Sequence, residues 1–455
     1  MTLSRRSFTA LALGAAAQPR AALAQEMSML DAMRAPLSAP TSEFNAAMAA
    51  ITDRGSPDMA AALITALRFS RSRGPQIAAA LEAITGEDYF TDWFAWMLWQ
   101  ERNPQITPHP DLPTFKREVL VRIDENFAGF LRPAAIQPDK MRIRLEEIAW
   151  GGVVKDGIPS LDNPDLIAAE DAAYLRGDDL VFGVSINGDV RAYPLRIMGW
   201  HEMFNEVIGG VPVALAYCTL CGSGILFETQ VAGRANPLIF GSSGFLYRSN
   251  KLMFDRATNS LWNQYTGQPV VGPLVGRGIT LRQRPVVITT WDSWRASNPS
   301  TQVLSLDTGH RRNYGSGVVY NDYFASPDLM FPAQVDQRVH QQKDYVFAIR
   351  QFGAARAWPL DAFADQPVIN DAIAGTPLLL IGDPDTRSVR AYERKSHVFT
   401  PADGRLRATD GTMWRATEDA LVGPDGARLP RVAGHISYWF AWDNYLGDSA
   451  SVYDG

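Results

Sequence analysis

The sequence predicts an α+β protein, with a helical N-terminal domain followed by a β-rich domain built from two related halves. Three observations predict this fold class. Residues 26–135 carry apolar side chains at helical spacing, residues beyond about 140 form short β-branched runs separated by turn residues, and one segment of the first half recurs in the second. With 46% hydrophobic and 20% charged residues, the 455-residue chain is not of the disordered or coiled-coil class.

The first 24 residues predict an export signal. Ser4-Arg5-Arg6-Ser7-Phe8 is a twin-arginine pattern, a short apolar run follows, and Ala22-Leu23-Ala24 provides a cleavage site. No stretch reaches the roughly 18 apolar residues of a membrane-spanning helix. We therefore expect a periplasmic protein, with the signal cleaved near Ala24 and no integral membrane span in the mature chain. Removal of the signal takes the net charge from −6 to −9, which argues against a nucleic acid partner.

The helical domain is predicted over residues 25–135. Apolar residues recur at helical spacing in 60–67 and 77–84, and the segment between them contains Gly74-Pro75, which is typical of a helix boundary. A third, aromatic-rich helix is expected over 88–99. Four prolines between 104 and 113 end that run, and one more helix is expected over 115–130.

The first β-rich repeat is predicted over 140–340. Residues 180–186 form an apolar, β-branched run that meets Asn187-Gly188, a two-residue hairpin signal, and residues 190–195 provide the returning strand. Residues 214–217 read as a buried strand that ends at Cys218. Residues 200–205 are expected to form a short helical turn with His201 and Asn205 on one face.

The second, degenerate β-rich repeat is predicted over 341–455. Residues 181–195 and 346–360 are identical at seven of 15 positions without a gap. At the same offset Asn205 falls opposite Asn370, whereas Cys218 falls opposite Asp383 and Cys221 opposite Thr386. His201 likewise falls opposite a glutamine. Because residues needed only to build a repeat tend to recur in both copies, this difference favours a functional role for the unmatched residues.

The candidate site consists of Cys218, Cys221 and His201, and the two cysteines are the only ones in the chain. Two thiolates and one imidazole are soft ligands, so we predict a site for a soft metal. Copper is the metal expected in an oxidising compartment, with zinc or no metal as alternatives. Such a site would serve an oxidative reaction or metal handling. Glu202, next to His201, is a candidate orienting group or general base.

Two other interpretations of the cysteine pair stay open. A Cys-x-x-Cys pair can cycle between dithiol and disulfide, which would make the protein a thiol–disulfide oxidoreductase. Alternatively the pair is a structural disulfide in a non-enzymatic binding or scaffold protein.

The expected partner is a small molecule or a periplasmic protein. Asn205, Tyr247, Asp255 and Trp262 are the candidate residues for binding a cofactor or ligand beside the site.

Several motifs together resemble the domain of unknown function 3179 family. They include Tyr217-Cys218-x-x-Cys221-Gly222, Ser243-Gly244-x-Leu246-Tyr247 and the closing Trp439-Phe440-Ala441-Trp442. The resemblance covers about 140–455 and not the helical domain. It implies an exported or envelope protein, and it supplies no reaction. Thr219 stands where members of the family often have proline, which weakens a rubredoxin-like interpretation of the cysteine loop.

Overall fold

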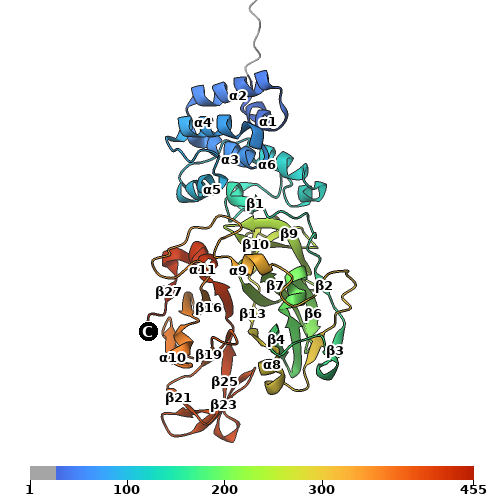
Figure 1. The fold of residues 1–455 in the computed structure, drawn as a ribbon, viewed down its shortest axis with the longest axis vertical. Coiled ribbons are helices and arrows are strands. Elements are labelled where there is room, and N and C mark those ends of the chain that lie inside the picture. Colours follow the sequence, from blue (N-terminus) through green and yellow to red (C-terminus); the bar gives the residue numbers. More distant parts are fainter. Residues whose placement is uncertain (1–26) are drawn as a thin grey trace, which may run out of the picture.

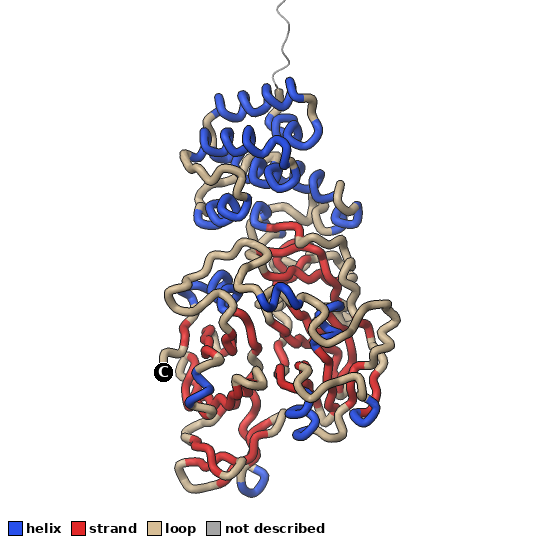
Figure 2. Tube along the Cα trace, viewed as in Figure 1, coloured by secondary structure: helices blue, strands red, loops and turns tan. Residues whose placement is uncertain are grey.

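The computed structural model describes residues 27–455, so the predicted signal peptide lies outside the described residues. It confirms the predicted fold class, with a helical N-terminal region followed by a β-rich region of several sheets. Figure 1 shows the helices at one end of the molecule and the two β-rich parts side by side at the other. Figure 2 shows that only short helices interrupt the β-rich parts.

Six α-helices form the N-terminal region. They are α1 (Met29–Ser38), α2 (Thr41–Arg54), α3 (Ala60–Phe69), α4 (Gly74–Thr85), α5 (Trp93–Arg102) and α6 (Leu112–Val121). Ser28 and Asp92 cap α1 and α5 by accepting backbone N–H groups, and α2 and α4 end at left-handed glycines. The helix expected over 115–130 is shorter than predicted, because Asp124 leaves helical geometry and caps a separate 3-10 turn, Glu125–Gly129.

The helical region packs firmly on the first β-rich half. Its own core is centred on α3, which buries seven of its ten residues. A second cluster joins the 3-10 turn to the neighbouring sheet, with the Phe127 and Phe245 rings 4.5 Å apart and the Phe130 and Phe254 rings 5.0 Å apart. These aromatic rings stabilise the junction through the hydrophobic effect, in proportion to the apolar area that they bury.

The first β-rich half contains three five-stranded sheets, in the orders β1-β9-β10-β11-β12, β13-β8-β7-β6-β2 and β14-β4-β5-β15-β3. The strands are β1 (Ile148–Trp150), β2 (Leu161–Asp162), β3 (Leu166–Ala168), β4 (Leu180–Ile186), β5 (Asp189–Pro194), β6 (Met203–Ile208), β7 (Val211–Cys218), β8 (Ser223–Glu228), β9 (Phe240–Tyr247), β10 (Asn250–Asp255), β11 (Leu261–Asn263), β12 (Gln268–Val271), β13 (Gln283–Arg284), β14 (Val287–Thr290) and β15 (Gln302–Leu304). Three helices accompany them, α7 (Leu195–His201), α8 (Trp291–Ser297) and α9 (Asn321–Ala325).

The second half contains a four-stranded sheet, β26-β16-β17-β27, and an eight-stranded sheet, β18-β19-β20-β25-β24-β23-β22-β21. Its elements are β16 (Tyr345–Gln351), β17 (Ala354–Pro359), α10 (Ala362–Asp365), β18 (Val368–Ile373), β19 (Thr376–Asp383), β20 (Ser388–Glu393), β21 (Phe399–Ala402), β22 (Arg405–Ala408), β23 (Met413–Ala416), β24 (Ala420–Val422), β25 (Arg428–Val432), β26 (His435–Tyr438), α11 (Trp439–Leu446) and β27 (Ser451–Val452).

The strand bounds of the two halves repeat in register. Strands β4 to β8 match β16 to β20 without a shift, so that β7, Val211–Cys218, corresponds to β19, Thr376–Asp383. Each half begins its repeat with a hairpin, β4–β5 in the first half and β16–β17 in the second. The second strand of each hairpin also pairs in parallel with a strand near the end of the same half, β5 with β15 and β17 with β27. The structure therefore supports the register that sets Cys218 opposite Asp383 and Cys221 opposite Thr386.

The two halves share one hydrophobic core, which includes Phe182 and Leu215 from the first half and Trp358 and Leu380 from the second. None of the helices within residues 27–455 has the length and apolar character needed to cross a bilayer.

Candidate functional site

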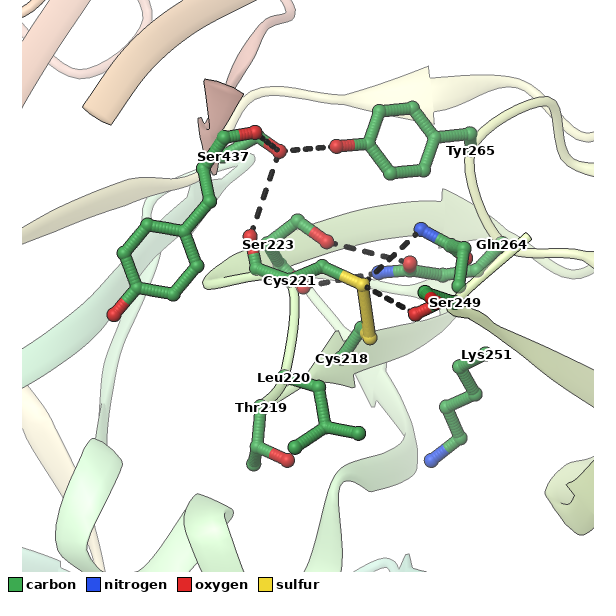
Figure 3. The surroundings of a disulfide bond; sticks show 12 residues. Cys218, Thr219, Leu220, Cys221, Ser223, Ser249, Lys251, Gln264, Tyr265 and Ser437 are labelled. Carbon is green, nitrogen blue, oxygen red and sulfur yellow. Dashed lines mark hydrogen bonds between the residues drawn. A yellow bond between two sulfur atoms is a disulfide. The ribbon is translucent and has the colours of Figure 1, made fainter. Parts of the chain in front are cut away.

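The Cys218–Cys221 loop is a tight turn that connects two buried strands. Cys218 ends β7 and pairs with Ser223 at the start of β8. The N–H of Cys221 donates to the carbonyl of Cys218, and Gly222 takes a positive φ of 62°, which lets the chain turn into β8. This geometry brings the two cysteines to a Cα–Cα distance of 5.2 Å, and a disulfide joins them (Figure 3). Both side chains are buried, with 2% and 0% exposure.

The sulfur of Cys221 has polar neighbours from the β9–β10 turn. The Asn250 Nδ2 group donates to this sulfur at 3.4 Å, and the carbonyl oxygen of Ser249 lies 3.5 Å from it. Arg248 and Ser249 both adopt positive φ, 48° and 60°, although neither is glycine. Such conformations cost about 1 kcal/mol or more each and persist where packing requires them. The strained turn thus holds an amide donor against one of the two sulfurs.

A buried ion pair is attached to the middle of the same loop. Glu202 Oε1 accepts a hydrogen bond from Thr219 Oγ1 at 2.9 Å, and Glu202 Oε2 lies 2.8 Å from Lys251 Nζ. The two charged side chains are only 9% and 5% exposed. Glu202 itself has a positive φ of 55°, because the chain reverses there between α7 and β6. The reversal turns the carboxylate of Glu202 toward the cysteine loop.

A segment between the two halves covers the loop. We call residues 320–332 the strap. The Tyr323 hydroxyl donates to the carbonyl of Leu220 at 2.7 Å, and Ser249 Oγ donates to the carbonyl of Pro332. Lys343 Nζ donates to the carbonyls of Tyr323 and Ser326 and lies 3.5 Å from the centre of the Tyr323 ring. These contacts hold the strap over the loop that carries both sulfurs.

A cavity of about 260 Å³ also reaches the loop, and Asn321 and Phe324 of the strap are among its lining residues. Gly222 and Tyr217 line it from the first half, and Tyr345 and Arg387 line it from the second. Arg387 donates to the Tyr345 hydroxyl at 2.9 Å, with its guanidinium over the same ring. The cavity therefore ends at the backbone next to Cys221, with the guanidinium groups of Arg387 and Arg196 at its wall.

The structure does not bring His201 to the cysteines as a third metal ligand. His201 Nδ1 bonds the carbonyl of Pro159 at 2.9 Å and its Nε2 bonds the Tyr314 hydroxyl at 2.6 Å, so both ring nitrogens are engaged elsewhere. Burial lowers the pKa of His201 to about 4, which keeps the ring neutral. Within residues 27–455 no group of three or more His, Cys, Asp or Glu side chains is arranged to hold a metal ion. The donor set therefore does not fit the predicted three-ligand site.

The expected helical turn over 200–205 is also wrong, because α7 ends at His201 and Asn205 lies within β6. Asn205 bonds both backbone groups of Phe240, at 2.8 and 2.9 Å. Asn370 makes the same pair of bonds with Phe399 in the second half. The recurrence gives Asn205 an architectural role, which is to dock a strand onto β6.

The remaining predicted residues support the first half in similar ways. Asp255 accepts hydrogen bonds from the Thr258 backbone at 2.7 Å and from the Trp262 indole at 2.9 Å, which closes the turn between β10 and β11. Tyr247 pairs with Asn250 across the β9–β10 hairpin, and its ring meets that of Tyr445 edge-on. Tyr247 and Asp255 both belong to the β9–β10 hairpin that carries the sulfur contacts, and Tyr247 lies beside the turn that makes them.

Sequence reasoning missed the groups that surround the disulfide, namely Ser249, Asn250, Lys251 and Tyr323. One signal was available: Asn250 and Lys251 open an apolar β-strand, and a buried lysine is rare unless it is paired. The tyrosine in the strap gave no such signal, because its contact with Leu220 joins segments 103 residues apart.

Comparison with known proteins gives one family. The family model described as "Protein of unknown function (DUF3179)" matches residues 155–449. No curated protein and no solved structure matches the chain. The match covers the loop, the ion pair and the strap, and leaves the helical region outside.

Proposed function

We propose that this chain, which belongs to the family of proteins of unknown function DUF3179, is a thiol–disulfide redox protein whose reactive centre is the Cys218–Cys221 pair. The observation that carries the proposal is the contact of the Asn250 amide with the Cys221 sulfur beside a buried disulfide. A hydrogen bond to sulfur stabilises its thiolate form, and a more stable thiolate leaves faster in exchange reactions.

The reaction is an exchange with a dithiol of a partner protein or small molecule. A partner thiolate attacks the sulfur of Cys218, which forms a mixed disulfide and releases Cys221 as a thiolate. The second partner thiolate then attacks the mixed disulfide and releases Cys218. Two electrons pass from the partner, which leaves as a disulfide, and the two partner protons end on Cys218 and Cys221.

The surroundings accommodate the reduced state. In the reduced state the thiol of Cys221 can donate to the carbonyl oxygen of Ser249, which lies 3.5 Å from the sulfur. The Asn250 amide can continue to donate to the Cys221 sulfur. A buried thiol without a hydrogen-bond partner would destabilise the reduced protein by about 1–3 kcal/mol. Because the Cys221 thiol has partners, reduction does not carry this cost. Glu202 and Lys251 act as positioning residues, because they hold Thr219 between the two cysteines.

The second half provides an internal comparison. At the corresponding turn Thr386 Oγ1 donates to the carboxylate of Asp383 at 2.8 Å, so a side-chain hydrogen bond closes the turn there. The same hairpin therefore forms without a disulfide. A disulfide that the architecture does not require, placed next to a strained turn and a buried ion pair, supports a chemical role for Cys218 and Cys221.

Titration of the intact protein with thiol–disulfide redox buffers tests the proposal. We expect one reversible two-electron transition, with a potential above about −300 mV, the range of structural disulfides. In the Cys221→Ser variant, Cys218 should form a persistent mixed disulfide with a small thiol, whereas Cys221 in the Cys218→Ser variant should react far more slowly. A pair that stays oxidised in the folded protein down to that potential would contradict the proposal.

Two other functions are outcomes of the same experiments. Stoichiometric binding of Cu(I) or Zn(II) by the reduced protein, dependent on both cysteines, would favour metal handling. A permanently oxidised pair would favour a binding or scaffold role, with the 260 Å³ cavity beside Gly222 as the ligand site.

The proposal includes export to the periplasm by the twin-arginine route, because an oxidising compartment maintains such a disulfide. Cell fractionation of the wild type and of an Arg5→Lys, Arg6→Lys variant tests it. We expect the mature protein in the periplasm and the variant in the cytoplasm, and equal distributions would refute the route.

A further inference from the structure

A second, larger cavity lies between the two halves. Its volume is about 710 Å³, and its walls come from the β4–β5 turn and β13 on one side and from β16, β25 and the turn before β24 on the other. The labels β4, β13, β16 and β25 mark these strands in Figure 1. None of the candidate site residues predicted from the sequence lines it. Five arginines and two carboxylates line it, so its walls are positive although the whole chain is acidic.

The carboxylates near this cavity are already engaged. Glu418 pairs with Arg431 and, at 2.7 Å, with Arg390, while Glu228 is shared between Arg284 at 2.5 Å and Arg282 at 3.3 Å. Asp419 accepts a hydrogen bond from Ser185 across the junction of the halves. The acidic groups thus neutralise some of the arginines but not all of them.

Arg350 is a half-buried arginine of this cavity that is left without a counter-charge. It lies at the end of β16 and donates to the backbone carbonyl of Tyr265 at 2.9 Å, and among the described residues no carboxylate pairs with it. Burial lowers the pKa of Arg350. A desolvated charge without a partner is costly, and proteins retain such a charge where a ligand supplies the missing one.

A guanidinium suits an oxyanion well, because it can donate two parallel hydrogen bonds to it. Arg428, which is exposed at the rim, adds a further positive charge.

We propose that this cavity binds a small oxyanion, a phosphate- or carboxylate-bearing molecule, with Arg350 as its principal donor. The bound anion lies between the two halves of the β-rich region, because Arg282 and Arg350 line the cavity from different halves. It replaces the missing counter-charge of Arg350. The site is independent of the Cys218–Cys221 chemistry.

Isothermal titration calorimetry of the intact protein with inorganic phosphate and with succinate tests the site, with sodium chloride at matched ionic strength as the reference. We expect saturable binding of at least one of the two anions, and the stronger one identifies the phosphate or the carboxylate source. Arg350→Gln should weaken binding at least tenfold. Arg407→Gln, which changes an exposed arginine on β22 outside the cavity, should leave it unchanged.

Binding that is equal in the wild type and Arg350→Gln, or that chloride reproduces, would overturn the proposal. If Arg350→Gln does not fold, Arg428→Gln decides instead. A several-fold weaker affinity in that rim variant supports the site, and an unchanged affinity refutes it.

Discussion

Replacement of Tyr323 by phenylalanine is predicted to speed the reduction of the Cys218–Cys221 disulfide about fivefold. Both sulfurs are buried and the strap bonds the loop that carries them, so we expect opening of the strap to let a reductant reach them. The Tyr323 hydroxyl contributes one hydrogen bond to the closed state, 2.7 Å to the carbonyl of Leu220. A hydrogen bond of about 1 kcal/mol corresponds to a factor of about five in the opening equilibrium.

The assay is the rate of reduction by excess dithiothreitol, followed by alkylation and mass spectrometry. It is run where the rate is proportional to reductant concentration, because the rate then reports the population of the open state. Tyr392→Phe is the matched control, since the Tyr392 hydroxyl also donates to a backbone carbonyl at 2.7 Å, in the second half. Equal rates in Tyr323→Phe and wild type, or equal acceleration in the control, would refute control of access by the strap.

Three further predictions concern the site and its surroundings. Reduction of the disulfide should lower the free energy of unfolding by about 2 kcal/mol, the chain-entropy value for so short a loop, and leave a folded protein in urea titrations. Lys251→Met should cost about 3–5 kcal/mol because it leaves the buried Glu202 carboxylate unpaired, and Lys251→Met with Glu202→Gln should recover more than half of this loss. The pKa of His201 is lowered from 6.5 to about 4, so its contribution to stability is full above pH 6.5 and is lost as the pH falls through 4. His201→Gln should therefore make the melting temperature less sensitive to pH in that window, and an unchanged slope would contradict the assignment.

Local signals predicted the fold well. The apolar, β-branched run in 180–186 corresponds to β4, and Asn187-Gly188 forms the turn into β5. Both turn residues take the positive φ that a hairpin of this type needs. The repeat predicted the register of β7 and β19. The 3-10 turn after α6 was missed, because the capping bond of Asp124 competes locally with an otherwise helical pattern.

The site was predicted in part. The sequence singled out Cys218, Cys221 and Glu202, which the structure brings together through Thr219. His201 is adjacent to Glu202 in the sequence, yet the chain reverses between them, so that its ring points to Tyr314 instead. Sequence neighbours can face opposite ways at a left-handed residue, and a single sequence does not reveal where such a residue lies.

The comparison of the two halves distinguishes residues that build the repeat fold from residues that are candidates for a chemical role. Asn205 and Asn370 make identical backbone contacts, so this position serves the repeat fold. The turn after β7 differs from the turn after β19 in every feature that bears on sulfur chemistry: a disulfide replaces a hydrogen bond, and Glu202 has a proline at its place in the second half. Buried charges and strained turns oppose folding unless something else requires them. The Glu202–Lys251 pair bonds Thr219 between the two cysteines, which supports the proposed redox chemistry of Cys218 and Cys221.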